Sequence, residues 1–114
     1  MADLTHIDKD GNAVMVDVSA KDETARVATA AGRIEMQPET AQLIASHGVK
    51  KGDVLSIAQL AGIMGAKRTP DLIPLCHPIA LSSVEVTLAL DTDAHAVTIT
   101  GTCKTKGQTG VEME

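Results

Sequence analysis

The sequence of 114 residues contains no Phe, Tyr or Trp. Single-strand nucleic-acid binders and RNA-recognition modules stack bases on aromatic side chains, so both classes are excluded. An aromatic cage for a quaternary ammonium ligand is excluded for the same reason. A core without rings also lacks side chains that each bury about 150–250 Å². We therefore expect a homo-oligomer that buries apolar surface between subunits, with a marginally stable monomer as the alternative.

Positive charge, cysteine and long apolar runs are also scarce. Ten Lys and Arg stand against fifteen Asp and Glu, which gives a net charge of −5 and disfavours nucleic acid as a partner. Two cysteines, Cys76 and Cys103, make no disulfide framework and indicate a reducing, cytoplasmic location. No apolar run approaches the roughly 18 residues of a membrane span, and the N-terminus lacks the features of a secretory signal. No membrane partner is expected.

The remaining composition, 44% hydrophobic and 22% charged, is that of one globular domain. The polar residues 1–13 predict a flexible arm, and residues 14–114 predict a single α+β domain. Residues 15–18 form a short strand-like run, and residues 26–36 predict a strand with Gly32 as a candidate bulge. Alternating apolar residues over 84–90 and 97–103 predict a hairpin that turns at 91–94 and ends at 107–110.

Two helices are predicted between these strands. Pro38 suits a first helical turn, with Leu43 and Ile44 facing inward and Gly48 just beyond the end. Asp53 caps a second helix over residues 54–67, whose apolar residues lie nearly all round, so we expect it to be largely buried. Gly62 and Gly65 in this helix suggest close packing against another backbone. The order of elements predicts an antiparallel sheet with helices on one face.

A basic island is the first candidate for chemistry. Residues 50–77 carry a net charge of +2, against −7 for the rest of the chain, which indicates a small anionic ligand. Lys51 lies at the entrance of the second helix, where free backbone N–H groups also favour anions. Lys67 and Arg68 lie at its far end, where cations suit the helix dipole without any ligand.

The second candidate is the segment Pro74-Leu75-Cys76-His77-Pro78. Histidine is the usual acid or base near neutral pH, and two prolines fix the backbone around it. A structural His77 and a buried Cys76 thiol remain alternatives, as does a nucleophilic Cys76. No paired ligand spacing accompanies them, so no metal site is predicted.

The third candidate is the tail, residues 104–114. Its glycines do not match the phosphate-loop pattern, which excludes that class of nucleoside triphosphatase. Two carboxylates, Glu112 and Glu114, remain two positions apart. They are candidates for proton transfer, and a solvated acidic tail is the alternative.

Four segments together resemble one family, the cyclic pyranopterin monophosphate synthases, also called the molybdenum cofactor biosynthesis protein C family. The segments are Met15-Val16-Asp17-Val18-Ser19-Ala20-Lys21, Lys51-Gly52-Asp53, Lys67-Arg68-Thr69 with Asp71-Leu72-Ile73-Pro74-Leu75-Cys76-His77-Pro78, and Thr109-Gly110-Val111-Glu112-Met113-Glu114. The resemblance implies a ferredoxin-like α+β subunit in a homohexamer, a trimer of dimers, with active sites at subunit interfaces. It implies conversion of 3′,8-cyclo-7,8-dihydroguanosine 5′-triphosphate into cyclic pyranopterin monophosphate, with release of pyrophosphate.

The resemblance also implies the site residues. The catalytic positions fall on Lys51, His77, Glu112 and Glu114. The substrate-binding positions fall on Asp17, Arg26, Lys67, Leu75, Cys76, His77, Met113 and Glu114. No protein-bound metal is implied, and Mg²⁺ would accompany the triphosphate.

The family pattern continues beyond the Glu-Met-Glu segment into a helix with a catalytic Asp and Lys, whereas the printed sequence ends at Glu114. A chain ending there is expected to bind the triphosphate but to release pyrophosphate at a rate near background. A non-catalytic, oligomeric module that binds anions or nucleotides is the alternative function. Pyrophosphate release discriminates between the two.

Overall fold

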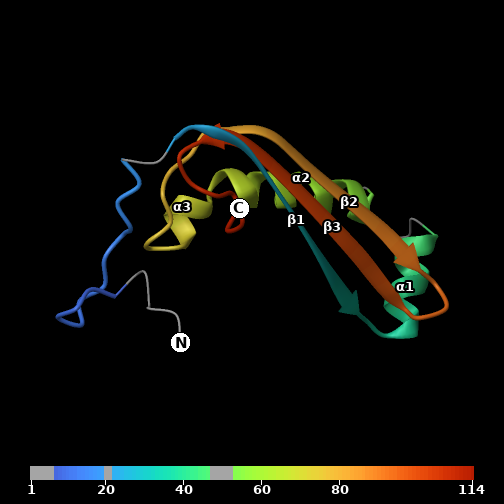
Figure 1. The fold of residues 1–114 in the computed structure, drawn as a ribbon. Coiled ribbons are helices and arrows are strands. Elements are labelled where there is room, and N and C mark those ends of the chain that lie inside the picture. The colour runs from blue at the N-terminus through green and yellow to red at the C-terminus, as the bar shows by residue number, and fades with distance from the viewer. Residues whose placement is uncertain (1–6, 20–21, 47–52) are drawn as a thin grey trace.

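The structure is a computed structural model that describes residues 7–19, 22–46 and 53–114. The elements in chain order are β1 (Thr24–Glu35), α1 (Pro38–Ala45), α2 (Val54–Lys67), α3 (Thr69–Leu72), β2 (Leu81–Asp91) and β3 (Ala96–Gly107). The strands form one antiparallel sheet in the order β1-β3-β2, and the helices lie on one face of it (Figure 1). The predicted α+β, ferredoxin-like class is confirmed.

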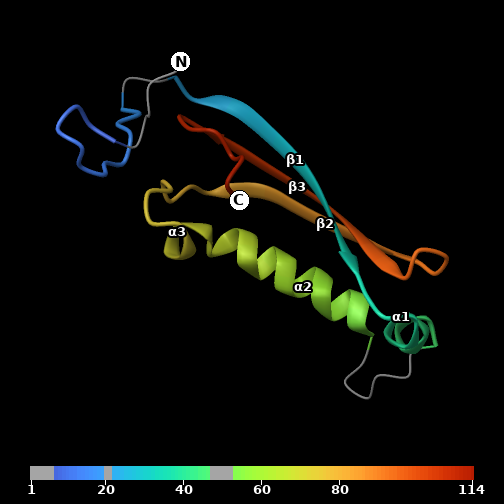
Figure 2. The same cartoon turned by 90° about the horizontal axis from the view of Figure 1, so that it is seen from below.

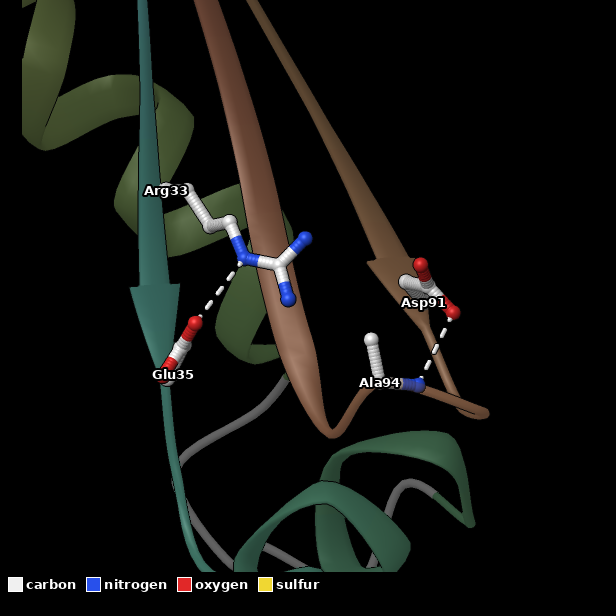
Figure 3. Close-up of polar contacts among 4 residues, drawn as sticks. All are labelled: Arg33, Glu35, Asp91 and Ala94. Carbon is white, nitrogen blue, oxygen red and sulfur yellow. Dashed lines mark hydrogen bonds and ion pairs between the residues drawn. The ribbon is translucent and has the colours of Figure 1, made fainter.

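The hairpin of β2 and β3 forms where the alternating pattern predicts it. Asp91 Oδ1 accepts a hydrogen bond of 3.1 Å from the Ala94 N–H and so closes the turn (Figure 3). On β1, Arg33 and Glu35 lie two positions apart, hence on one face, and form an exposed ion pair of 3.4 Å in the same view.

The pairing of β1 with β3 corrects one expectation. It is unbroken from Thr24 opposite Gly107 to Glu35 opposite Ala96, so the bulge expected at Gly32 is wrong. Gly32 lies opposite Ile99 in regular register, and no extra residue has to be accommodated there. The irregularity in the sheet lies instead at the start of β2, between Leu81 and Ser83.

Helix α1 begins at Pro38 as predicted, but it turns a different side inward. Ala41 is the buried residue, whereas Leu43 is 51% exposed, so the expectation that Leu43 faces inward is wrong. At 3.6 residues per turn, two positions place Leu43 on nearly the opposite side of the helix from Ala41. Ile44, three positions from Ala41, is half-buried. Gly48 lies outside the described residues.

Helix α2 has the predicted cap, because Asp53 Oδ1 accepts a hydrogen bond of 3.0 Å from the Leu55 N–H. The helix runs along β2 (Figure 2) and packs on it. Gly62 allows close approach to the sheet, since a Cβ there would lie 3.3 Å from the Val86 methyl groups. A Cβ on Gly65 would meet nothing within 4 Å, so close packing holds for Gly62 alone.

The prediction that α2 is largely buried is wrong. Leu60 and Met64 are 62% and 59% exposed, and Ile57 is 49% exposed. The helix rests on β2 with one side, and no described element covers the opposite, equally apolar side. None of the helices among the described residues combines the length and apolarity needed to cross a membrane.

The buried core is small. One cluster lies between the end of α2, the sheet and the tail and consists of Ala66, Cys103 and Val111, with partly buried side chains packed around them. The other buried apolar residues of the described chain are Ala41, Ala96 and Val97. The accessible surface of 8206 Å² exceeds the roughly 5,900 Å² typical of a folded monomer of this mass. The radius of gyration, 18.1 Å, likewise exceeds the roughly 13 Å typical of this length. The fold therefore leaves much apolar surface open.

Candidate active site

A cavity of about 500 Å³ lies where three segments distant in sequence meet. The three segments lie at the end of the sheet near α3 and the C-terminus, away from the β2–β3 turn (Figures 1 and 2). The lining residues are Val16, Val18, Ile73, Pro74, Leu75, Cys76, His77, Thr109, Gly110, Glu112, Met113 and Glu114.

The middle segment is positioned by the end of α2. Thr69 Oγ1 donates to the carbonyl groups of Gly65 and Ala66, at 3.1 and 3.0 Å, and so ties α3 to the last turn of α2. After α3 the chain turns, with the Cys76 N–H donating to the Ile73 carbonyl at 3.1 Å. The irregular backbone expected between the two prolines is present, and it places Cys76 and His77 in the cavity wall.

His77 is half-buried and hydrogen bonded to the first segment. Its Nε2 contacts the Val16 carbonyl oxygen, which can only accept a hydrogen bond. Residues 14–18 are not a strand, contrary to the strand-like pattern at 15–18. A strand needs a neighbouring ladder of backbone hydrogen bonds, and here the Val16 carbonyl bonds a side chain instead.

Asp17 lies in the same segment but does not line the cavity, unlike Val16 and Val18 on either side of it. Its Oδ1 accepts a hydrogen bond of 2.9 Å from the Ser19 N–H. The hydrogen bonds from the Ser19 backbone and side chain lower the pKa of the Asp17 carboxyl, and the charge of His77 acts in the same direction.

Cys76 connects the middle segment to the tail. Its Sγ lies 3.5 Å from Glu114 Oε2, to which the thiol donates. Burial raises the pKa of the Cys76 thiol, and the carboxylates of Glu114 and Glu112 raise it further. Burial and Glu114 raise the pKa of the Cys103 thiol in the same way. A protonated thiol is a hydrogen-bond donor, and this environment argues against Cys76 as a thiolate nucleophile.

The tail is held by Val111, which is 2% exposed in the core. The Glu112 carboxylate lies against Gly110, because a Cβ on that glycine would fall 2.0 Å from Glu112 Oε2. Glu114 is half-buried against Cys76, whereas Met113 between the two carboxylates is 55% exposed. The alternative of a freely solvated acidic tail is therefore wrong for Glu114.

The structure gathers part of the predicted site. Leu75, Cys76, His77, Glu112, Met113 and Glu114 all line the cavity. Arg26 is half-buried on β1 and its Nε donates to the Gly107 carbonyl at 3.4 Å, outside the lining. Lys67 is exposed at the end of α2, also outside the lining, and Lys51 falls outside the described residues.

The cavity also uses residues that the sequence did not single out as site residues. Val16 contributes a backbone carbonyl and Gly110 contributes the absence of a Cβ, and neither leaves a chemical signal in a sequence. Both fall within the segments that carry the family resemblance, which was the one available signal. No group of three or more His, Cys, Asp or Glu side chains suited to a metal ion occurs in the described parts of the chain.

Comparison with known proteins identifies the family. The MoaC family model matches residues 15–114, a range that includes all three cavity segments. A cyclic pyranopterin monophosphate synthase of Rhodospirillum rubrum is 68% identical over 111 residues, which cover 97% of this chain and 67% of that protein. Proteins of the same name from Parvibaculum lavamentivorans and Roseiflexus sp. are 60% and 56% identical, over 97% and 100% of this chain and 69% and 72% of theirs. The chain belongs to the MoaC family.

Proposed function

We propose that this protein is the lyase that converts 3′,8-cyclo-7,8-dihydroguanosine 5′-triphosphate into cyclic pyranopterin monophosphate and pyrophosphate, in molybdenum cofactor biosynthesis. The observation that carries the proposal is 68% identity, over 97% of this chain, to a relative named for that product. The cavity supports it, because six of the residues that the resemblance assigns to substrate and catalysis line one space of about 500 Å³. That volume suits a nucleotide-sized ligand.

We assign acid–base catalysis to His77, Glu112 and Glu114. Opening a purine ring and closing a pterin ring require several proton transfers, and these side chains combine an imidazole with two carboxylates in one wall. The Cys76 thiol orients Glu114 through its hydrogen bond. Leu75 and Met113 add apolar contact area to the same lining.

We assign phosphate binding to Lys51, Lys67 and Arg26. The described cavity lining holds two carboxylates and no Lys or Arg, so the positive charge that a triphosphate needs has to come from residues beyond it. Cyclic phosphate formation expels pyrophosphate, whose developing charge these cations would stabilise. Mg²⁺ would bind through the phosphate oxygens of the substrate, since the described residues gather no three-ligand metal set.

We also propose that the functional unit is a homo-oligomer, a hexamer by resemblance to the family. The accessible surface exceeds that of a typical monomer by about 2,300 Å², which is the scale of an obligate interface. The apolar side chains of Ile57, Leu60 and Met64 on the open side of α2 are available for such contacts. Light scattering at micromolar concentration tests this proposal, and a monomer would contradict it.

The test of the function is pyrophosphate release from the cyclised triphosphate, measured on the 114-residue chain and on a chain extended by the C-terminal helix of the family pattern, in which the variants below are made. The enzyme frees pyrophosphate, whereas a module that only binds anions or nucleotides returns the substrate unchanged. His77→Ala and Lys51→Ala should each lower turnover by about 100-fold or more, the usual cost of losing an acid–base or charge-stabilising group. Arg33→Ala, at an exposed ion pair remote from the cavity lining, is the matched control and should leave turnover unchanged.

A further inference from the structure

The contact between His77 and Val16 determines which ring nitrogen of His77 carries a fixed proton. The Val16 carbonyl oxygen has no hydrogen to give, so the Nε2 that it contacts must be the donor. This holds for the neutral ring and for the imidazolium alike, because Nε2 bears a proton in both forms while it remains bonded to the carbonyl.

The other nitrogen, Nδ1, has no hydrogen-bond partner among the described residues. It is also not sealed off, since no buried side-chain nitrogen or oxygen of the described chain lacks a partner. A half-buried ring with an unpartnered Nδ1 therefore keeps that atom open to solvent, and the ring belongs to the cavity wall.

We propose that the Val16 carbonyl holds His77 as the Nε2–H tautomer, so that Nδ1 is the atom through which His77 accepts and gives protons in the cavity. Residues 16–18 then act as a positioning element for the catalytic ring. Val16 orients His77 through its backbone, and Val18 closes the wall beside it. The assignment of Nδ1 to catalysis rests on the proposed function, whereas the tautomer does not.

Asp17 fits the same arrangement. It sits between Val16 and Val18, is exposed and is absent from the cavity lining, and its Oδ1 accepts a hydrogen bond from the Ser19 N–H. The charge of His77 is one of the causes that lower the pKa of the Asp17 carboxyl. Asp17 is thus part of the positioning element of residues 16–18, and this reassigns it from direct substrate contact.

The first test reads the tautomer directly, with no substrate present. Long-range proton–nitrogen NMR correlations of the full protein distinguish a protonated from an unprotonated ring nitrogen, and His77→Gln identifies the His77 signals by their loss. The expected result is a neutral ring with Nε2 protonated and Nδ1 bare, and an Nε2–H proton that exchanges slowly with water. A protonated Nδ1, or a ring that averages both tautomers with rapid proton exchange, would overturn the proposal.

The second test separates holding from catalysis with two amide variants. The Gln side chain in His77→Gln reaches the Nε2 position and can still donate to Val16, whereas the Asn side chain in His77→Asn reaches only the Nδ1 position. Hydrogen exchange of the amides in residues 14–19 should have the same rate in His77→Gln as in the natural protein and become faster in His77→Asn. Equal exchange in the two variants would contradict the role of Val16.

Turnover completes the second test. His77→Gln keeps the contact with Val16 but has no group that titrates, so pyrophosphate release should fall by about 100-fold or more. Near-normal turnover in His77→Gln would show that the ring is only a structural link, and would overturn the role of Nδ1. Absence of pyrophosphate release by a chain extended with the C-terminal helix of the family pattern would refute the proposed function instead, and the NMR result would still decide the tautomer.

Discussion

Val111 anchors the tail that carries the two carboxylates proposed for catalysis, so its truncation offers a quantitative test of the fold. The side chain is 2% exposed and packs with Ala66 and Cys103. Val111→Ala removes two methylene equivalents at about 0.8 kcal/mol each, and the remaining cavity brings the expected loss to roughly 2–3 kcal/mol. For a domain of this size, this corresponds to a fall in Tm of about 8–12 °C.

The assay is urea unfolding followed by far-ultraviolet circular dichroism, because a chain without Trp or Tyr offers no useful intrinsic fluorescence. The midpoint should fall with little change in slope. Val27→Ala is the matched control, since the same side chain is 61% exposed there and its truncation should cost less than about 0.5 kcal/mol. Equal losses in the two variants would refute the placement of Val111 in the core.

Three further changes test the site and the hairpin. Gly110→Ala places a methyl group where the Glu112 carboxylate lies, so turnover should fall at least about tenfold with Tm nearly unchanged, because the displaced group is the end of a flexible side chain. Glu114→Gln removes a charge that raises the pKa of the Cys76 thiol, so iodoacetamide should modify Cys76 faster at mildly alkaline pH, as measured by peptide mass spectrometry. His95 has a φ of 52°, so His95→Val should lose about 1–2 kcal/mol in urea unfolding, whereas His95→Asn should be neutral or stabilising.

Each of these three has its own control and contrary outcome. Gly107→Ala adds a methyl group that meets nothing within 4 Å, and a loss of turnover equal to that of Gly110→Ala would remove Glu112 from the explanation. Unchanged modification of Cys76 in Glu114→Gln would mean that the carboxylate does not contact the thiol. Equal stability of the Val and Asn variants at position 95 would mean that this residue does not need the left-handed conformation.

The hairpin, the Asp53 cap and the start of α1 were predictable because each depends on local chemistry. The alternation of apolar and polar residues acts within a few positions. The same is true of a side chain that accepts a hydrogen bond from the first turn of its own helix, and of a proline in that turn. The burial of α2 was not predictable, because its apolar residues lie nearly all round and only tertiary packing selects the side that rests on β2. The strand predicted at 15–18 is wrong for a similar reason. A strand forms only beside a neighbouring strand, and the local sequence pattern does not show whether one is there.

The candidate site likewise has a part that the sequence could predict and a part that only the folded chain determines. Residue types singled out Cys76, His77, Glu112 and Glu114, and the resemblance added Leu75 and Met113, all of which line the cavity. Nothing in the residue types pointed to the backbone carbonyl of Val16, because every residue has such a carbonyl whatever its side chain. The hydrogen bond between Cys76 and Glu114 joins positions 38 apart, and only the folded chain sets their distance.

The topology of the sheet imposes an order on folding. The β2–β3 hairpin closes a short loop, whereas β1 pairs with β3 through residues far apart in the chain, such as Thr24 opposite Gly107. Closing the longer loop costs more chain entropy and comes later, so the hairpin is the natural nucleus and β1 docks afterwards. The cavity draws on residues 16–18, which precede β1, and 109–114, which follow β3. It therefore takes shape only in the last steps of folding, and an intermediate that retains the hairpin alone has no binding site.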